Sequence, residues 1–176
     1  MLRGQVVQLR LLREGDLDEY FERMSDLEAR GPYFPVGLTG EPDLRREFEK
    51  TGFWSNDEGT FLVVHRGGAM VGEIEFFPIA SYLSGYEISY LIFGAEHRGK
   101  GYASEALGLL VGYLFGRRRV NRLQLNIHPE NEASKRVATK CGFRLEGVMR
   151  ECWFNRGRFN DLEVWSLLRD EAAPPS

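Results

Sequence analysis

The sequence predicts a single α/β domain in which a mixed sheet carries helices on both faces. The chain has 176 residues, close to one ordinary domain, and 43% of them are hydrophobic. Segments of strand character alternate with amphipathic segments, and strand–helix–strand units favour parallel pairing. Two turn signals, Gly67-Gly68 and Asn155-Arg156-Gly157, are instead typical of antiparallel hairpins. We expect one domain over residues 1–170 and a flexible tail over residues 171–176.

The first part of the chain predicts one strand and two helices. Alternating apolar residues indicate a strand over 7–11. Asp16 begins a capping-box-like pattern, and the apolar residues after it recur at helical spacing as far as Leu27. A loop rich in glycine and proline is expected over 31–42, and Asp43 is the expected N-cap of a short second helix.

The rest of the chain predicts six strands and two helices. The strands are expected over residues 60–66, 69–78, 86–93, 122–128, 143–154 and 159–168. A glycine-rich turn precedes a long helix with one apolar stripe, formed by Ala103, Ala106, Leu107, Leu110, Val111 and Leu114. A shorter helix over 131–141 ends at Gly142, which suits the left-handed conformation that follows many helices. The predicted order is therefore β-α-α-β-β-β-α-β-α-β-β.

Composition argues against several classes of function. The formal net charge of −3 does not fit a general nucleic-acid binder, and we expect no direct contact with nucleic acid. Charges recur every few residues at the start of the chain, and no apolar run approaches about 18 residues, so neither a secretion signal nor a membrane span is expected. Two cysteines are too few for a disulfide framework or a zinc cage, and no metal is expected. The cytoplasm is the expected location.

Positive charge is concentrated in residues 96–144. This segment holds ten basic and four acidic residues, which leaves a net charge of +6. Its glycine-rich turn lies between a predicted strand and a predicted helix. Backbone N–H groups, the positive end of the helix, and the side chains of Arg98 and Lys100 can face an anion there. We therefore expect the turn to bind a phosphate group.

The residues of this turn do not match two other phosphate-binding motifs. Gly101 follows Lys100, where a Walker loop needs serine or threonine. Ser104 stands where a dinucleotide-binding fingerprint needs glycine or alanine. A glycine-rich turn without a ligand is the remaining alternative. A second helix start, capped by Asn131 and carrying Arg136, favours a ligand, because two helix N-termini at neighbouring strand ends can hold one extended polyphosphate.

Two runs of residues carry a resemblance to a known family. R-G-K-G-Y-A-S-E-A at 98–106 and N-x-x-S-x-R-V-A-x-K-C-G-F at 131–143 resemble the GNAT acetyltransferase superfamily. The nearest members are Rim-type N-terminal acetyltransferases of ribosomal proteins, with their spermidine and antibiotic acetyltransferase relatives. The resemblance implies a mostly antiparallel sheet with one splayed parallel strand pair, and acetyl-CoA or coenzyme A as cosubstrate. It implies cofactor contacts at Leu91, Ile92, Phe93, Arg98, Gly99, Lys100, Gly101, Tyr102, Ala103, Ser104 and Asn131. Arg136 is expected to join them because of its positive charge on the second helix.

Three positions depart from the family pattern. Glu96 stands where the family's loop usually begins with glutamine or arginine. Ala138 occupies the position of a tyrosine general acid that many members carry. Asn126 stands where some N-terminal acetyltransferases place a carboxylate base. The usual acid and one usual base of the family are therefore absent.

Acyl transfer from a thioester to an amine needs a neutral amine, a stabilised carbonyl oxygen and a proton for the departing thiolate. Backbone N–H groups near Leu91 can serve the oxygen. Ser134 is the predicted proton donor to the thiolate, because Rim-type relatives carry serine at the matching position. Glu87 is the preferred base, with Glu75 and Asp161 as alternatives.

These observations lead to one expected function and two alternatives. We expect direct transfer of an acetyl or other short acyl group to a primary amine in a ternary complex, with a protein or peptide N-terminal α-amine as the leading acceptor. A small-molecule amine, such as an antibiotic, an aminosugar or a polyamine, is the close second. A non-catalytic acyl-CoA-binding module is the alternative from another class. The chain is expected to be a monomer or a homodimer.

Overall fold

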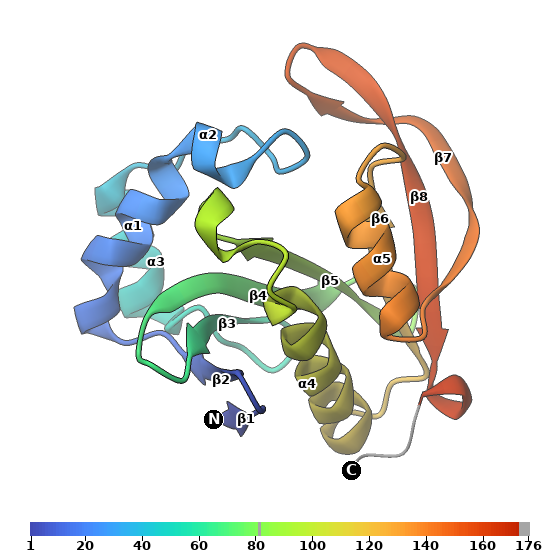
Figure 1. Ribbon diagram of the computed structural model, residues 1–176, viewed down its shortest axis with the longest axis horizontal. Coiled ribbons are helices and arrows are strands. Elements are labelled where there is room, and N and C mark those ends of the chain that lie inside the picture. The colour runs from blue at the N-terminus through green and yellow to red at the C-terminus, as the bar shows by residue number, and fades with distance from the viewer. Residues whose placement is uncertain (81, 173–176) are drawn as a thin grey trace.

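An eight-stranded sheet runs through the part of the chain that the structure describes, residues 1–80 and 82–172 (Figure 1). In this computed structural model the strands lie in the order β1-β2-β3-β4-β5-β6-β8-β7. Their bounds are β1 Leu2–Arg3, β2 Val7–Leu11, β3 Gly59–His65, β4 Met70–Pro78, β5 Gly85–Ile92, β6 Arg122–Ile127, β7 Arg144–Asn155 and β8 Arg158–Leu168. The bounds of β2 to β8 agree with the predicted strands to within one residue at each end, whereas the short strand β1 was not predicted.

One parallel pair interrupts an otherwise antiparallel sheet. Strands β5 and β6 pair in parallel from Gly85 with Arg122 to Glu87 with Gln124, and no further pairing between them is found in the described residues. Strand β5 continues to Ile92 along β4, so its other edge has no strand partner past Glu87. The two strands therefore splay apart, which confirms the predicted mixed sheet with a splayed parallel pair.

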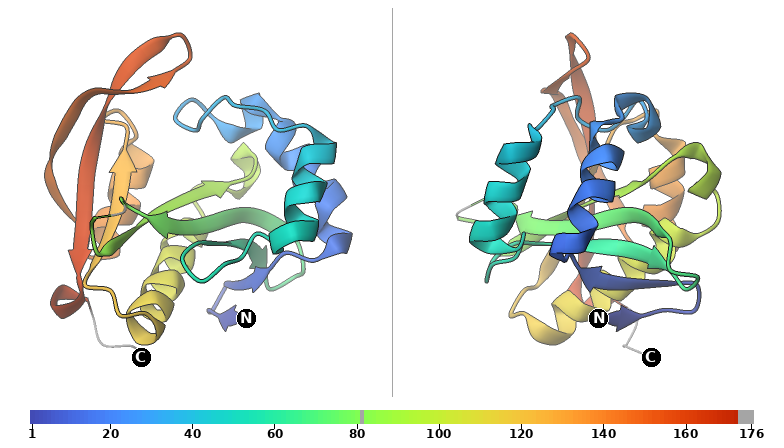
Figure 2. Two further views of the ribbon diagram at one scale, coloured as in Figure 1. Left: turned by 180° about the vertical axis from the view of Figure 1, so that it is seen from behind. Right: turned by 90° about the vertical axis from the view of Figure 1, so that its left-hand side faces the viewer.

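Helices cover both faces of the sheet (Figure 2). The helix α4 Tyr102–Arg117 and the helix α5 Glu132–Lys140 lie on one face. On the other face lie α1 Leu17–Ser25, α2 Leu27–Arg30 and α3 Glu41–Thr51. Short 3₁₀ turns occupy Glu14–Asp16, Ala95–His97 and Arg169–Glu171.

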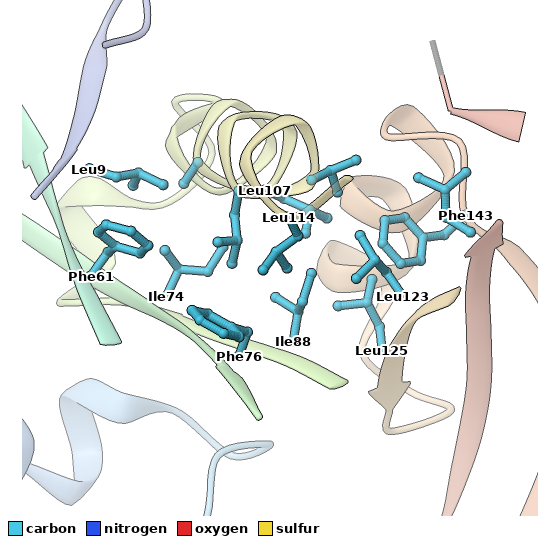
Figure 3. Packing of buried hydrophobic residues seen from close by; sticks show 14 of the residues in the cluster. Leu9, Phe61, Ile74, Phe76, Ile88, Leu107, Leu114, Leu123, Leu125 and Phe143 are labelled. Carbon is cyan, nitrogen blue, oxygen red and sulfur yellow. The ribbon is translucent and has the colours of Figure 1, made fainter. Parts of the chain in front are cut away.

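The core is split into two layers by the sheet. Alternate residues of β3 point to opposite faces, so Phe61 packs under α4 while Leu62 packs under α1 and α3. Leu107, Leu110 and Leu114 recur at helical spacing on α4 and are fully buried against Ile74 and other strand residues (Figure 3). The central strands are therefore apolar on both faces, and the predicted stripe of α4 faces the sheet.

The beginning of the chain differs from the prediction because tertiary contacts compete for its polar side chains. Asp16 does not cap α1: its carboxylate accepts hydrogen bonds from the Arg10 guanidinium at 2.6 and 2.7 Å and from the Arg13 N–H at 2.8 Å. The helix ends at Ser25, because Asp26 caps the separate helix α2. Its predicted extension to Leu27 is therefore wrong.

Helix α3 also begins earlier than predicted. Its N-cap is Gly40, and Asp43 lies inside the first turn. Pro42 occupies that turn without conflict, since the first N–H groups of a helix have no intrahelical partner. The predicted loop over 31–42 is accordingly shorter, and the expected N-cap Asp43 is corrected to Gly40.

The C-terminal end of the described chain is part of the fold. The Glu171 carboxylate pairs with Arg144 at 2.7 Å, and Ala172 packs against the core under α4. The predicted flexible tail began at residue 171, and residues 173–176 of it lie outside the described residues.

The start of α4 is held by the first turn of the chain. The Glu105 carboxylate accepts hydrogen bonds from the backbone N–H groups of Gln5, Val6 and Val7, the last at 2.9 Å. A Cβ atom at Gly4 would lie 2.5 Å from Glu105 Oε1, so the turn approaches the carboxylate as closely as glycine allows. Residues far apart in the sequence thereby fix the helix start in place.

Candidate active site

The splay between β5 and β6 opens into a cavity of about 480 Å³. Four segments line it: the end of β5, the turn before α4 with the first turn of α4, one side of α5 along its length, and the loop after α2. Both helices direct their N-terminal ends toward it. The cavity is therefore a place where two positive helix ends and a free strand edge meet.

The glycine turn presents unbonded backbone donors to this cavity. Gly99 and Gly101 have φ angles of 72° and 81°, in the left-handed region, and a Cβ at either would meet nothing within 4 Å. Glycine is thus required there by conformation and not by space. Because the N-cap Gly101 has no side chain, the N–H groups of Tyr102, Ala103 and Ser104 have no hydrogen-bond partner among the described residues. This is an anion-binding helix start.

The two basic residues of the turn are placed differently. Arg98 lines the cavity, but its guanidinium donates to the Ala29 carbonyl and, at 3.4 Å, to the Ile92 carbonyl. It therefore ties α2 to the end of β5. Lys100 is exposed and does not line the cavity. The phosphate contact expected at this turn therefore depends more on its backbone N–H groups than on the side chains of Arg98 and Lys100.

On the strand edge, two of the three predicted residues line the cavity. Leu91 and Ile92 do so. Phe93 does not: it is 2% exposed in the core under α1 and α3, and its N–H donates to the Val71 carbonyl at 2.9 Å. The prediction for Phe93 is corrected on this ground, because its backbone donor is already used by the neighbouring strand.

The start of α5 has the predicted cap. The Asn131 side chain accepts a hydrogen bond from the Ser134 N–H at 3.1 Å, and both residues line the cavity. Arg136 and Lys140 also line it and make no ion pair within residues 1–80 and 82–172. Lys135 instead pairs with Glu132 at 2.6 Å. Two cations without an ion pair in these ranges therefore face the cavity from α5, Arg136 in its middle and Lys140 at its end.

Several lining residues were not predicted from the sequence, among them Tyr33 and Phe34 of the loop after α2 and Tyr90 of β5. Tyr90 of β5 lines the cavity, and its buried hydroxyl has no hydrogen-bond partner in the described chain. Burial raises the pKa of Tyr90 to about 12, while the nearby Ser134 hydroxyl acts in the opposite direction. In the sequence Tyr90 is one more aromatic residue of a strand, and only the fold places it beside Ser134.

The predicted bases lie on the other face of the sheet. Glu87 sits where β5 and β6 separate, and its carboxylate accepts a hydrogen bond from Asn126 Nδ2 at 2.8 Å. Burial raises the pKa of the carboxyl groups of Glu75 and Glu87 above the usual range. Neither residue lines the cavity. They face the side covered by α1 to α3, opposite to the two helix starts.

Asp161 is held in a structural role. Its carboxylate accepts the N–H of Glu151 at 2.8 Å, and Glu151 has a φ angle of 49° at a bulge in β7. The side chain therefore stabilises an irregular turn of the strand pair. Asp161 does not line the cavity, and this placement argues against it as the base.

A bridge between distant segments closes one side of the cavity. The Tyr33 ring stacks on His128 with 4.8 Å between ring centroids, and Asn155 Nδ2 donates to the Phe34 carbonyl at 3.4 Å. Arg156 donates to the Gly31 carbonyl at 3.1 Å. Figure 1 shows the loop after α2 and the tip of the β7–β8 hairpin at the same end of the molecule. The sequence carried no signal for this bridge.

Two features are not found in the part of the chain that the structure describes. Among residues 1–80 and 82–172, no group of three or more His, Cys, Asp or Glu side chains is placed to hold a metal ion. None of the helices in the same ranges is both long and apolar enough to cross a membrane.

The geometry is typical of a class of protein: enzymes whose cosubstrate is extended and carries phosphate groups, which two helix N-termini at one cavity suit. The family model described as an acetyltransferase (GNAT) domain matches residues 7–144. The chain belongs to the GNAT acetyltransferase family, and it is an acyl-CoA-dependent N-acetyltransferase with acetyl-CoA as its cosubstrate.

Solved structures of this family have the same fold. A GNAT-family acetyltransferase from Bacillus anthracis matches with a TM-score of 0.81 at 28% identity, covering 97% of this chain and 99% of that chain. Spermidine N-acetyltransferase from Vibrio cholerae, in complex with CoA and spermine, matches with a TM-score of 0.81 at 25% identity, covering 94% and 96%.

Curated relatives differ in their acceptors and in coverage. The uncharacterized N-acetyltransferase p20 of Bacillus licheniformis is 33% identical over 64% of this chain and 62% of that protein. Spermidine N(1)-acetyltransferase of Vibrio cholerae is 24% identical over 93% of each. Ribosomal-protein-serine acetyltransferase of Escherichia coli is 25% identical over 62% and 60%. The acceptor of this chain does not follow from these names.

Proposed function

We propose that this enzyme transfers an acetyl group from acetyl-CoA to a primary amine of a cationic acceptor, with thioester and amine meeting at the splay between β5 and β6. One observation carries the proposal. The splay joins a cavity that suits an anionic cosubstrate to a sheet face with the half-buried carboxylates Glu75 and Glu87. Opposite charges thus approach the same point from opposite faces.

The cosubstrate's phosphates are assigned to the first of the two helix starts. The unbonded N–H groups of Tyr102, Ala103 and Ser104 support this assignment, because they offer donors at the positive end of α4. Arg136 and Lys140 supply whole charges from α5. The free edge of β5 at Leu91 and Ile92 is left for the acyl-bearing arm.

The remaining residues are assigned to proton transfer. An amine must lose a proton to attack, and ordinary amine pKa values lie near 8 for an α-amine and 10.4 for lysine. Glu87 is the proposed base, since burial makes its carboxylate more basic and it lies at the point of the splay. Ser134 is the proposed hydroxyl beside the leaving sulfur. Attack forms the C–N bond, loss of thiolate breaks the C–S bond, and no enzyme-bound acyl group is required.

Two acceptor classes fit this site. A protein or peptide N-terminal α-amine is supported by the resemblance to Rim-type enzymes and by the ribosomal-protein relative. A polyamine is supported by a second observation, because the two half-buried carboxylates, Glu75 and Glu87, favour an acceptor with more than one positive charge and the spermidine-acetylating relative covers most of the chain. A peptide and a polyamine are therefore the two acceptors to compare first.

Ligand-induced stabilisation tests the cosubstrate. Ligand at a hundred times its Kd stabilises a protein by about 2.7 kcal/mol, and for a domain of this size Tm rises by roughly 5–10 °C. We expect this rise with acetyl-CoA and coenzyme A and not with ATP or NAD. No rise with the coenzyme A compounds contradicts the proposal.

Thiol release tests the reaction and the acceptor. Wild-type protein with acetyl-CoA is offered spermidine, a basic peptide with a free α-amine, the same peptide with a blocked N-terminus, and an aminosugar. We expect release above background with one class. A Tm rise without release from any amine supports the non-catalytic binding module instead. The cytoplasmic location and the monomeric or dimeric state stay predictions, which cell fractionation and sedimentation test.

A further inference from the structure

Tyr90 places a hydroxyl group without a described hydrogen-bond partner at the wall of the cavity. Its side chain leaves β5 on the face covered by α4 and α5 and packs against the core there. The hydroxyl is buried, yet it has no hydrogen-bond partner among the described residues. A buried hydroxyl without a hydrogen-bond partner destabilises the folded state, so its presence at this position needs an explanation.

A second tyrosine of this protein shows how a buried hydroxyl is ordinarily paired. Tyr20 is also buried, but its hydroxyl donates to a Glu73 carboxylate oxygen at 2.5 Å on the opposite face of the sheet. Tyr90 has no such acceptor and instead lines the cavity together with Ser134. Its free donor is therefore available to a bound ligand, at the wall where the strand edge and the α5 start meet.

We propose that Tyr90 protonates the coenzyme A thiolate as it leaves, and that Ser134 positions the Tyr90 hydroxyl for this transfer. This inference rests on the proposed function. The amine nitrogen bonds to the carbonyl carbon, the C–S bond breaks, and the sulfur takes the electron pair with the proton from Tyr90 Oη. The proton lost by the amine passes through Glu87 to solvent, and solvent returns a proton to the Tyr90 phenolate. The net products are the amide and the free thiol.

The other groups around the cavity are poorer donors to the sulfur. Arg136 and Lys140 carry full charges that suit phosphate groups. The thiol of Cys141 donates to the Ser104 carbonyl at 3.4 Å, and burial raises its pKa to about 11. His97 lines the cavity just before the glycine turn, and its Nε2 lies 3.5 Å from the Glu96 carboxylate. Tyr90 keeps its proton at neutral pH, because burial also raises its pKa, and so it is in the donor form.

Replacement by phenylalanine isolates the hydroxyl. We expect Tyr90→Phe to lower kcat at least tenfold while the Kd for acetyl-CoA stays within twofold of wild type. Tyr86→Phe is the matched control, because Tyr86 lies on the same strand and face but does not line the cavity. If Tyr90→Phe keeps more than half of the wild-type kcat, or loses activity only as far as it loses acetyl-CoA binding, the proposal is overturned.

A titration of bound coenzyme A gives a readout that needs no acceptor. The thiolate absorbs in the ultraviolet, so the pKa of the bound thiol is measured by difference against free protein. A hydrogen bond from Tyr90 stabilises the thiolate, and we expect Tyr90→Phe to raise the bound thiol's pKa by about one unit, a tenfold effect. An equal pKa in wild type and variant contradicts the proposed donor.

A double variant tests the role of Ser134. If Ser134 acts through Tyr90, the Tyr90→Phe/Ser134→Ala protein should be no slower than Tyr90→Phe alone. If the losses in kcat of the two single variants multiply in the double variant, the positioning role of Ser134 is overturned. Wild-type protein that binds no coenzyme A refutes the proposed function and this inference together. Wild-type protein that binds it and releases thiol, with a Tyr90→Phe variant that matches it, refutes this inference alone.

Discussion

Replacing Glu73 by glutamine is expected to remove a pH-dependent part of the stability of this protein. The Glu73 side chain is buried under α1, where Tyr20 donates a hydrogen bond to it at 2.5 Å. Burial, and the negative charge of Glu75 nearby, raise the pKa of Glu73 to about 7 from an ordinary value of 4.5. Glutamine has the same shape and does not ionise, so the exchange isolates the titration.

The sign of this pH effect depends on whether the folded or the unfolded state holds the proton. Below about pH 4.5 the carboxyl is protonated in the folded and unfolded states alike. Between about pH 4.5 and 7 the unfolded chain has lost this proton while the folded chain keeps it, so stability falls as pH rises. The shift from 4.5 to about 7 corresponds to about 3 kcal/mol, at about 1.4 kcal/mol per pKa unit. Above about pH 7 the contribution is lost and the curve levels off.

Urea unfolding at several pH values between 4.5 and 8 measures this effect. We expect the free energy of unfolding of wild type minus that of Glu73→Gln to fall by about 3 kcal/mol over the range. Glu146→Gln is the control of opposite sign, because hydrogen bonds from Arg122 and Ser166 lower the pKa of Glu146 to about 2. Its contribution is present above the ordinary pKa and is lost only in more acidic solution. A wild-type minus Glu73→Gln difference that stays constant from pH 5 to 8 would refute the reasoning.

Three further variants address the cosubstrate site, and a fourth, Gly108→Ala, is a control outside it. Ser134→Ala should lower kcat at least tenfold with little change in acetyl-CoA affinity, and unchanged turnover in the thiol-release assay would remove Ser134 from the mechanism. Gly101→Ala places a side chain at a φ angle of 81° and should cost about 1–2 kcal/mol of stability and weaken acetyl-CoA binding. Gly108→Ala, in the middle of α4 with open space around it, should instead stabilise by about 0.5–1 kcal/mol in thermal unfolding, and equal effects of the two would contradict the turn argument. Arg136→Ala should raise the Kd for acetyl-CoA and reduce its salt dependence in titration calorimetry, whereas an unchanged salt dependence would place its charge away from the phosphates.

Local signals in the sequence predicted most of the fold. The Gly67-Gly68 turn does join β3 and β4, with Gly68 at a φ angle of 95°, and Gly142 does follow α5 at 86°. Such signals work because they depend on backbone conformation, which neighbouring residues decide. The same holds for the glycine turn at Gly99 and Gly101 and for the cap at Asn131.

Predictions for residues whose partners lie far away in the sequence were wrong or incomplete. Asp16 has the pattern of a cap, but Arg10 on the adjacent strand takes its carboxylate. Phe93 continues a cofactor-facing strand in the sequence, yet its N–H is already donated to Val71. Tyr90 looks like a core aromatic until α5 is placed beside it. Strand register and tertiary packing determine the contacts of these three residues, and a local sequence pattern predicts neither.

The contact between Glu105 and the turn at Gly4–Val7 has a consequence for how the cosubstrate binds. The carboxylate ties the first turn of α4 to β2, so the unbonded N–H groups of the glycine turn are held in place before any ligand arrives. Little backbone entropy is then left to lose when a phosphate group binds. We therefore expect that a change which displaces Gln5 or Val6 loosens the start of α4, about a hundred residues away in the sequence, and weakens acetyl-CoA binding.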